Sequence, residues 1–299
     1  MARIDAAGSK WMEAMRLRTL PVGVSGVLAG CGLAVWQGRF SFVPALLCLF
    51  FALSAQIAAN FGNEYYDFKN GIDRKGRAGF RRGVTEGDIS PRAMKRAMFV
   101  SLGVSAVIGC ALLYYGGSWL LPAGCAILFF AVAYSAGPYP LSHHGLGDVA
   151  VVVFFGLVPV TFTAYLQTGG WYELPVSLAL SVAIGLLAAN VLVVNNYRDM
   201  EDDMAAGKRT TVVIFGRKTM GRAYLLSGIA AMVIMTPLWL RLPMWTWFVP
   251  LLYMACHIST WSRLVHAQGS AFNALLGRSA FNLLLFTLLL LGVLVVCRA

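Results

Sequence analysis

Two short segments of the 299-residue sequence combine carboxylate and amide side chains at helical spacing. The first contains Asn60, Asn63, Glu64 and Asp67, spaced i, i+3, i+4 and i+7, and continues to Gly71 and Asp73. Residues three and four apart are neighbours on a helix, so the first four side chains share one face if the helix continues through them. Glycine often ends a helix, so we expect the helix to stop near Gly71 and Asp73 to lie in the following loop.

The second segment repeats this arrangement. Asn195, Asp199 and Asp203 are spaced i, i+4 and i+8 and again line one helix face. Cations follow the carboxylates in both segments, namely Arg81 and Arg82 after the first, and Lys208 and Arg209 after the second. The same order of side chains, carboxylates and then cations, thus occurs twice in the chain.

Like charges four residues apart repel each other, so each acidic cluster needs a neutralising partner. Magnesium fits this need, because it binds one or two carboxylates per ion and takes its remaining ligands from water and substrate phosphates. The nearby Arg and Lys side chains would neutralise the remaining phosphate charge. The two segments therefore predict a site for Mg²⁺ and a diphosphate. The alternative is a pair of solvated helix ends whose acids simply pair with neighbouring bases.

The rest of the sequence is that of an integral membrane protein. Hydrophobic residues make up 59% of the chain and charged residues 12%, against about 25% charged residues in a typical soluble domain. Apolar runs long enough to cross a ~30 Å hydrocarbon core as helices recur along the chain. We expect nine spans, at about 19–37, 41–63, 97–115, 119–136, 148–167, 174–195, 222–240, 244–262 and 279–297.

The distribution of charge predicts the topology. When successive loops are assigned to alternate sides of the membrane, only Arg39, Arg241 and Arg298 of the 24 Lys and Arg residues fall on the far side. Positive loops stay in the cytoplasm, so we expect the N-terminus inside and the C-terminus outside. The net charge of +11 is then a consequence of topology, and we expect no nucleic-acid partner. Of the 13 Asp and Glu residues, only Glu173 falls outside, which the topology rule does not require.

At the two acidic segments the sequence resembles the UbiA-type intramembrane aromatic prenyltransferases, which carry an N-D-x-x-D-x-x-x-D-like motif and a second D-x-x-x-D motif. The resemblance extends over essentially the whole chain. Features typical of the branch that prenylates 1,4-dihydroxy-2-naphthoate are Arg18-Thr-Leu-Pro21, Arg81-Arg82-Gly-Val-Thr-Glu-Gly87, Tyr134 to Asp148 and Gly207-Lys-Arg-Thr210. Glu64 stands where the family pattern usually has Asp, which leaves the metal geometry open.

This resemblance implies an all-α bundle of about nine transmembrane helices, with a central cavity that opens to the cytoplasmic side. It also implies Mg²⁺-assisted ionisation of an allylic polyprenyl diphosphate, followed by attack of an aromatic ring on the resulting cation. In the naphthoate branch the prenyl group replaces the ring carboxylate, carbon dioxide is lost, and a demethylmenaquinone forms. Membrane lipid would accommodate the isoprenoid tail.

The resemblance, together with the residue types, assigns a role to each candidate. Glu64, Asp67, Asp73, Asp199 and Asp203 are the expected metal ligands, and Asp67, Asp199, Asp203 and Lys208 the expected catalytic residues. The expected substrate-binding residues are Asn60, Asn63, Arg81, Arg82, Tyr139, His143, Asp148, Asn195 and Arg209. Among these, His143 and Asp148 are assigned to the acceptor, where Asp148 would orient or deprotonate it.

Other functions remain open at this point. The same chemistry could act on 4-hydroxybenzoate or homogentisate, and the carboxylates could instead belong to a cation transporter. Transporters usually carry their charges near the bilayer midplane in broken helices, whereas these acids lie at the cytoplasmic ends of spans. We expect one domain, residues 1–299, in the cell inner membrane, with an interfacial segment (1–18) and two cytoplasmic active-site loops (64–96 and 196–222).

Overall fold

The computed structural model describes residues 2–76, 79 and 81–298, and over this part of the chain the fold is all-helical. Only an isolated bridge between His144 and Arg209 has β geometry among these residues. The helices are α1 (Ala2–Ala14), α2 (Leu20–Trp36), α3 (Phe42–Lys69), α4 (Pro91–Gly116), α5 (Leu121–Ala133), α6 (Gly147–Val151), α7 (Val158–Thr168), α8 (Leu174–Ala205), α9 (Thr211–Ile234), α10 (Thr236–Trp239), α11 (Phe248–Leu264) and α12 (Ala271–Val296). The prediction of an all-α membrane protein is confirmed.

Within the described residues, seven helical segments are long and apolar enough to cross a membrane: Gly8–Trp36, Phe42–Lys69, Pro91–Gly116, Gly147–Thr168, Leu174–Ala205, Thr211–Trp239 and Ala271–Val296. Two shorter helical segments, Ser118–Ala133 and Phe248–Leu264, lie where the sequence predicts the fourth and eighth spans. Each of the nine expected spans thus falls mainly on helix.

Helix length explains how two membrane helices carry polar residues beyond the hydrocarbon. At 1.5 Å per residue, α3 with 28 residues and α8 with 32 are about 42 and 48 Å long. Both helices are therefore longer than a hydrocarbon core of about 30 Å. Their C-terminal turns carry the two acidic clusters, and because charged side chains are costly inside the hydrocarbon, we expect these turns to lie outside it. The connections that follow are 70–90 and 206–210, narrower than the expected loops 64–96 and 196–222.

Glycines end both of these helices. Gly71 follows α3 with φ +70° and Gly207 follows α8 with φ +73°, a left-handed conformation that glycine adopts without steric cost. The expected end of the first acidic helix at Gly71, with Asp73 in the loop beyond, is confirmed. In the second case Gly207 places Lys208 directly after the helix, and the Lys208 amide bonds back to the Asp203 carbonyl at 2.8 Å.

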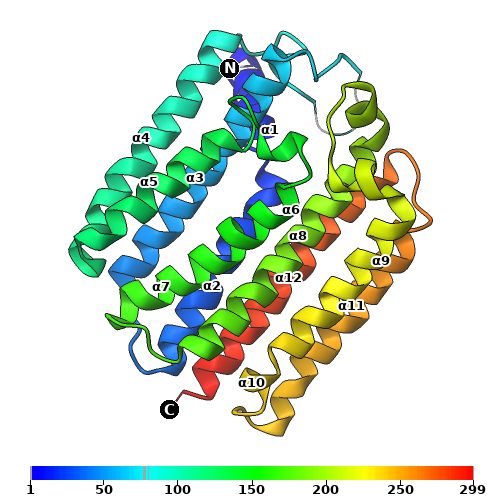
Figure 1. The fold of residues 1–299 in the computed structure, drawn as a ribbon. Coiled ribbons are helices and arrows are strands. Elements are labelled where there is room, and N and C mark those ends of the chain that lie inside the picture. Colours follow the sequence, from blue (N-terminus) through cyan, green and yellow to red (C-terminus); the bar gives the residue numbers. More distant parts are fainter. Residues whose placement is uncertain (1, 77–78, 80, 299) are drawn as a thin grey trace.

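Helix α8 forms the centre of the bundle and packs against α2, α9, α12 and the π-helix η4 (Val152–Leu157) (Figure 1). Its Leu180, Ile184 and Leu187 are fully buried. Between α6 and α7, η4 approaches α8 closely, and a Cβ added at Gly156 would lie 2.4 Å from the Gly185 Cα. Such small-residue contacts let membrane helices pack backbone to backbone. This contact fixes one wall of the bundle against its central helix.

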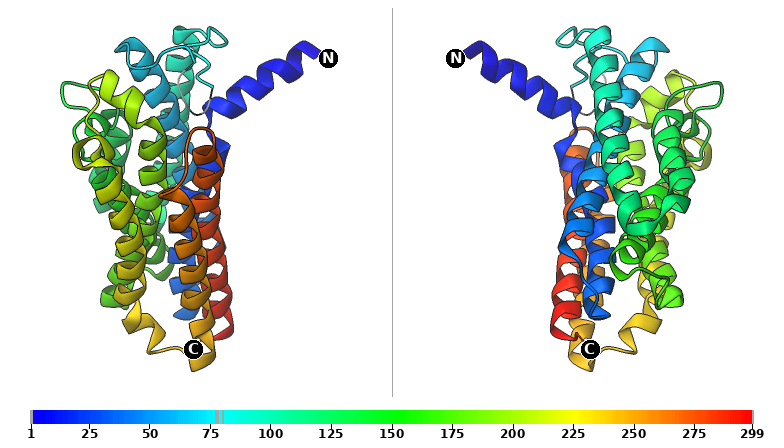
Figure 2. Two further views of the ribbon diagram at one scale, coloured as in Figure 1. Left: turned by 90° about the vertical axis from the view of Figure 1, so that its right-hand side faces the viewer. Right: turned by 90° about the vertical axis from the view of Figure 1, so that its left-hand side faces the viewer.

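Both acidic helix ends and the N-terminus lie at one end of the bundle, and the C-terminus lies at the other (Figure 1). Figure 2 shows α1 projecting sideways from the bundle at the acidic end. Its last turns are held there by Trp11, whose ring packs edge-on against Phe61 at 5.7 Å, and by Lys10, whose Nζ lies 2.9 Å from an Asp88 carboxylate oxygen.

Candidate active site

The first acidic cluster lies on the last turns of α3, facing the interior of the bundle. Glu64 and Asp67 are almost completely buried. Asn63 Nδ2 donates to Asp67 Oδ2 and to Ser135 Oγ, each at 3.2 Å. Glu64 accepts a hydrogen bond from the Val84 amide at 3.0 Å, which fixes the connection after α3. The predicted sharing of one helix face is therefore realised.

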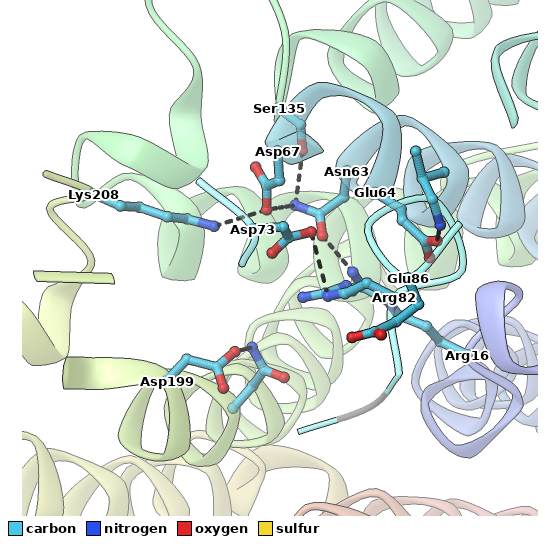
Figure 3. A network of polar contacts seen from close by, with 12 residues as sticks. Arg16, Asn63, Glu64, Asp67, Asp73, Arg82, Glu86, Ser135, Asp199 and Lys208 are labelled. Carbon is cyan, nitrogen blue, oxygen red and sulfur yellow. Dashed lines mark hydrogen bonds and ion pairs between the residues drawn. The ribbon is translucent and has the colours of Figure 1, made fainter. Parts of the chain in front are cut away.

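Three basic side chains reach the carboxylates of the first cluster. Lys208 Nζ, from the connection after α8, lies 3.4 Å from Asp67 Oδ2 (Figure 3). His143 Nε2 lies 3.4 Å from the other Asp67 oxygen. Arg82 Nε lies 3.5 Å from an Asp73 oxygen and holds that buried carboxylate. Lys208 and Arg82, two of the four cations predicted to serve a phosphate, thus pair with carboxylates of the first cluster in this structure.

The second acidic cluster lies on the last turns of α8. Arg198 clamps Asp199, with Nε 2.6 Å from Oδ1 and Nη2 2.9 Å from Oδ2. Arg198 also donates to the Asn195 side-chain carbonyl at 2.8 Å and to Asn273 of α12 at 3.1 Å. Asp203 is buried one helical turn further on. The sequence assigns no role to Arg198, although it stands within the motif.

The two clusters meet at a small polar pocket of about 50 Å³. Residues from both acidic segments and their connections line it, including Asn63, Arg82, Asn195, Asp199, Asp203, Lys208 and Asp148. Glu64, Asp67 and Asp73 lie outside this lining. Asp67 contacts its members Asn63 and Lys208, and Asp73 contacts its member Arg82. Residues about 140 positions apart in sequence are therefore brought to one site, as in the contact between Lys208 and Asp67.

A larger apolar cavity of about 360 Å³ adjoins the polar pocket. It is lined by α2, α3, α4, α5, η4, α7 and α8, mostly with Ala, Gly, Leu, Val and Phe. Arg16, Asn63, Tyr134, Leu192 and Asn195 line both spaces and form their common boundary. A ligand with a charged head and a long apolar tail would match this pair of spaces.

Arg16 is the boundary residue that sequence reasoning missed as a binding residue. It lies between α1 and the short helix η1 (Leu17–Thr19) and has a left-handed backbone, with φ 54°. This turn directs the side chain inward, where Nη2 donates to Asn63 Oδ1 (Figure 3). In the sequence, Arg16 is one of several basic residues near the start of the first expected span, and the positive-inside rule already explains such residues.

Several predicted binding residues lie outside both cavity linings. Arg81 is largely exposed and donates from Nε to Asp88 Oδ2 at 2.6 Å. Tyr139 is exposed and stacks on the His144 ring at 3.6 Å between centroids. Arg209 is exposed, and its amide bonds to the His143 carbonyl at 3.0 Å.

Asn60 lines the apolar cavity, and its Nδ2 donates to the Met15 carbonyl at 2.9 Å. This bond supports the turn that presents Arg16. Asp88, in the connection after α3, joins the same region to α1. Hydrogen bonds from Arg81 and Lys10 lower the pKa of Asp88 to about 2, so this carboxylate stays ionised at neutral pH.

The donor set suits magnesium by its chemistry, since buried carboxylate and amide oxygens from two helices surround one pocket. No three His, Cys, Asp or Glu side chains converge on a common point in the described part of the chain. Magnesium does not need such a group, because one or two carboxylates together with water and phosphate oxygens suffice. The carboxylates present therefore fit the predicted metal, provided that a phosphate completes the site.

Comparison with known proteins now identifies the family. Residues 24–273 match the UbiA prenyltransferase family. The chain belongs to this family. The resemblance predicted from the two acidic segments is confirmed, and with it a multi-pass prenyltransferase of the membrane.

Two relatives within the UbiA family cover most of the chain. It is 35% identical over 246 residues, 79% of each chain, to the 1,4-dihydroxy-2-naphthoate octaprenyltransferase of Escherichia coli (strain K12). It is 38% identical over 213 residues, 71% of each chain, to the protein of the same name from Mycobacterium leprae (strain TN).

A solved structure of a UbiA homolog from Archaeoglobus fulgidus, bound to DMAPP and Mg²⁺, has the same fold. The TM-score is 0.68, with 95% of this chain and 99% of that chain covered. At 17% identity this likeness concerns the fold alone.

Proposed function

We propose that the protein transfers a polyprenyl group from an allylic polyprenyl diphosphate to 1,4-dihydroxy-2-naphthoate in a Mg²⁺-dependent reaction. The observation that carries the proposal is the contact between the polar pocket and the apolar cavity, with Asn63, Arg16 and Asn195 at their boundary. The names of the two bacterial relatives favour the naphthoate as acceptor. The prenyl group replaces the ring carboxylate with loss of carbon dioxide, and the demethylmenaquinone forms first as its hydroquinone.

The diphosphate occupies the polar pocket in this proposal, and the tail occupies the apolar cavity. Lys208 and Arg82 line the pocket and each pairs with a carboxylate on α3 or its connection, and Arg16 lines it too and donates to the uncharged Asn63 side chain. An entering diphosphate takes these cations as partners. Their charge then stabilises the negative charge that develops on the departing diphosphate, which is where electrostatic catalysis acts.

The carboxylates of the two acidic segments are the proposed metal ligands, and Asp67 and Asp73 are released when Lys208 and Arg82 turn to the diphosphate. Asp67, Asp73 and Glu64 on one side and Asp199 and Asp203 on the other would hold Mg²⁺, with Asn63 and Asn195 orienting it and the phosphate. When bound, Mg²⁺ acts as a Lewis acid that makes diphosphate a usable leaving group. The solved relative that binds DMAPP with Mg²⁺ supports this assignment by fold.

The proposed topology places this site at the cytoplasmic surface. Nine spans, with Ser118–Ala133 and Phe248–Leu264 as the two short ones, put the N-terminus in the cytoplasm and the C-terminus outside. The cavity then opens toward the cytoplasmic side of the inner membrane, where a soluble naphthoate arrives. Residues 1–299 act as one unit, in which residues 1–18 lie at the membrane interface.

The test is transfer by the purified protein in detergent, with a labelled allylic diphosphate and Mg²⁺. We expect product and stoichiometric carbon dioxide with 1,4-dihydroxy-2-naphthoate. Transfer only to 4-hydroxybenzoate or homogentisate would keep the chemistry and reject this acceptor. Cation flux in proteoliposomes without any transfer would reject the enzyme and favour a transporter.

A further inference from the structure

Two buried polar atoms in the polar pocket have no hydrogen-bond partner among the described residues. They are Ser142 Oγ and Asp148 Oδ1. Other unsatisfied side-chain atoms occur elsewhere in the described part of the chain, but none belongs to another residue of the pocket lining. An unsatisfied buried polar atom costs about 1–3 kcal/mol. Two such atoms in the lining of one pocket mark positions where a ligand, or a water molecule in its absence, would supply the missing partner.

Asp148 is held in place by its other oxygen. Thr211 Oγ1, at the start of α9, donates to Asp148 Oδ2 at 2.5 Å. Oδ1 of the same carboxylate is left without a partner at the pocket. The carboxylate is therefore oriented by one hydrogen bond, and its second oxygen keeps an unused acceptor in the wall of the pocket.

Gly147, the neighbour of Asp148, adds no side chain to this wall of the pocket. A Cβ added at Gly147 would lie 3.3 Å from the Tyr134 hydroxyl and 3.3 Å from a Leu192 methyl group. A side chain at this position would therefore crowd Tyr134 and Leu192, and all three residues line the pocket. The five expected metal ligands come from α3, α8 and the connection after α3. Ser142, Gly147 and Asp148 come from the chain between α5 and η4.

We propose that Ser142, Gly147 and Asp148, with Tyr134, form the subsite for the aromatic acceptor, in which Asp148 accepts the proton of the ring hydroxyl beside the carboxylate. This inference rests on the proposed function, and it extends the role expected for Asp148 to a defined subsite. Ser142 bonds a second acceptor oxygen. The charged groups of α3 and α8 are left for the diphosphate.

The chemistry balances without a further reagent. Asp148 Oδ1 takes the hydroxyl proton, and the O–H electron pair forms a ring carbonyl as the neighbouring ring carbon bonds to the allylic carbon. The allylic C–O bond breaks, and its electrons leave with the diphosphate. The resulting β-keto acid loses carbon dioxide, which returns the bonding pair to the ring as an enolate. Asp148 then returns its proton to the enolate oxygen, giving the hydroquinone.

The test compares Asp148→Asn, Ser142→Ala and Gly147→Ala with Glu201→Gln, an exposed acid outside the pocket that pairs with Arg217. Asparagine keeps an oxygen to accept the Thr211 hydroxyl, so the fold is expected to survive. General-base loss predicts a fall of at least about 100-fold in kcat/KM for the acceptor in Asp148→Asn. Loss of one hydrogen bond in Ser142→Ala predicts about a tenfold rise in acceptor KM. Gly147→Ala should raise the acceptor KM, and the donor KM should stay within twofold in all four variants.

The decisive measurement uses 4-hydroxy-2-naphthoate, which lacks the hydroxyl beside the carboxylate. This analogue cannot form the ring carbonyl, so it should act as a competitive inhibitor, and wild type and Asp148→Asn should bind it with the same inhibition constant because the group that Asp148 contacts is gone. An equal weakening of analogue binding and of acceptor kcat/KM by Asp148→Asn would overturn the inference. An unchanged acceptor kcat/KM would also overturn it, because only water would then satisfy Oδ1. If the wild type transferred nothing to 1,4-dihydroxy-2-naphthoate, the proposed function itself would fail. That result concerns the wild type alone, so it is distinct from any result obtained with the variants.

Discussion

Replacement of Gly156 by Ala tests how the wall of the apolar cavity is held. A Cβ at this position would lie 2.4 Å from the Gly185 Cα and 2.4 Å from the Ser181 carbonyl oxygen. Both atoms belong to the backbone of α8, so no side chain can move aside. Restoring ordinary contact requires η4 and α8 to separate by about 1 Å.

The expected cost follows from this separation. Overpacking of this kind destabilises a protein by about 1–3 kcal/mol, which corresponds to a fall in Tm of about 2–12 °C. Phe154 and Phe155 of η4 line the cavity, and a displacement of 1 Å near a reacting group can cost about 100-fold in rate. We therefore expect Gly156→Ala to lose both thermal stability and transfer activity.

The matched control is Gly103→Ala in α4, where an added Cβ meets no atom within 4 Å. Alanine is the better helix former by about 1 kcal/mol, so this variant should keep or raise Tm. Thermal unfolding in detergent, followed by size-exclusion chromatography, measures the Tm of both variants. The transfer assay measures their activity. If Gly156→Ala matched Gly103→Ala in Tm and activity, the close backbone contact would not exist in the protein.

Three further predictions concern the polar end of the bundle. Arg16→Gln removes a charged donor that bonds Asn63 and borders both cavities, so the donor kcat/KM should fall by about 10- to 100-fold. Glu64→Gln keeps an oxygen for the Val84 amide but loses the charge, so the Tm should stay unchanged while the Mg²⁺ affinity falls. Glu64→Ala also loses that hydrogen bond, so it should lower both the Tm and the Mg²⁺ affinity. Because the pKa of Asp88 is lowered, its ion pairs stabilise the fold fully above its unfolded-state pKa of about 4 and are lost as the pH falls toward about 2. Protection of the connection after α3 from proteolysis should therefore be constant from pH 5 to 8.

Each of these predictions has a result that contradicts it. An Arg16→Gln enzyme with unchanged donor kinetics would make Arg16 a topology residue only. Equal loss of Tm in both Glu64 variants would assign Glu64 a purely structural role. For Asp88, the Asp88→Asn variant should be cleaved faster than wild type at pH 7, and wild-type protection that changed between pH 5 and 8 would show that another group holds this segment.

Much of the site could be predicted because it depends on local spacing. The sharing of a face by Asn63, Glu64 and Asp67 follows from the helical period alone, and the end of α3 near Gly71 follows from the conformational freedom of glycine. The convergence of the two acidic helix ends at one end of the bundle follows from topology. These features need no knowledge of tertiary contacts.

The features that the sequence did not reveal depend on contacts between distant residues. Arg81 and Arg82 are neighbours in sequence, yet Arg81 turns to Asp88 at the surface and Arg82 turns to Asp73 at the pocket. Nothing in their residue type separates them. Arg16 itself has a left-handed backbone conformation, and this turn brings its side chain to Asn63, which lies 47 positions away in the sequence. The pairing of the expected metal ligands with cations also required the structure.

The central claim is that both acidic helix ends serve one magnesium–diphosphate site. Single-turnover transfer from a labelled allylic diphosphate to 1,4-dihydroxy-2-naphthoate tests it most directly, with wild type, Asp67→Ala and Asp199→Ala, each in Mg²⁺ and in EDTA. We predict Mg²⁺-dependent product and carbon dioxide in wild type and a loss of at least about 100-fold in each variant. Full activity in either variant, or undiminished transfer in EDTA, would contradict the account.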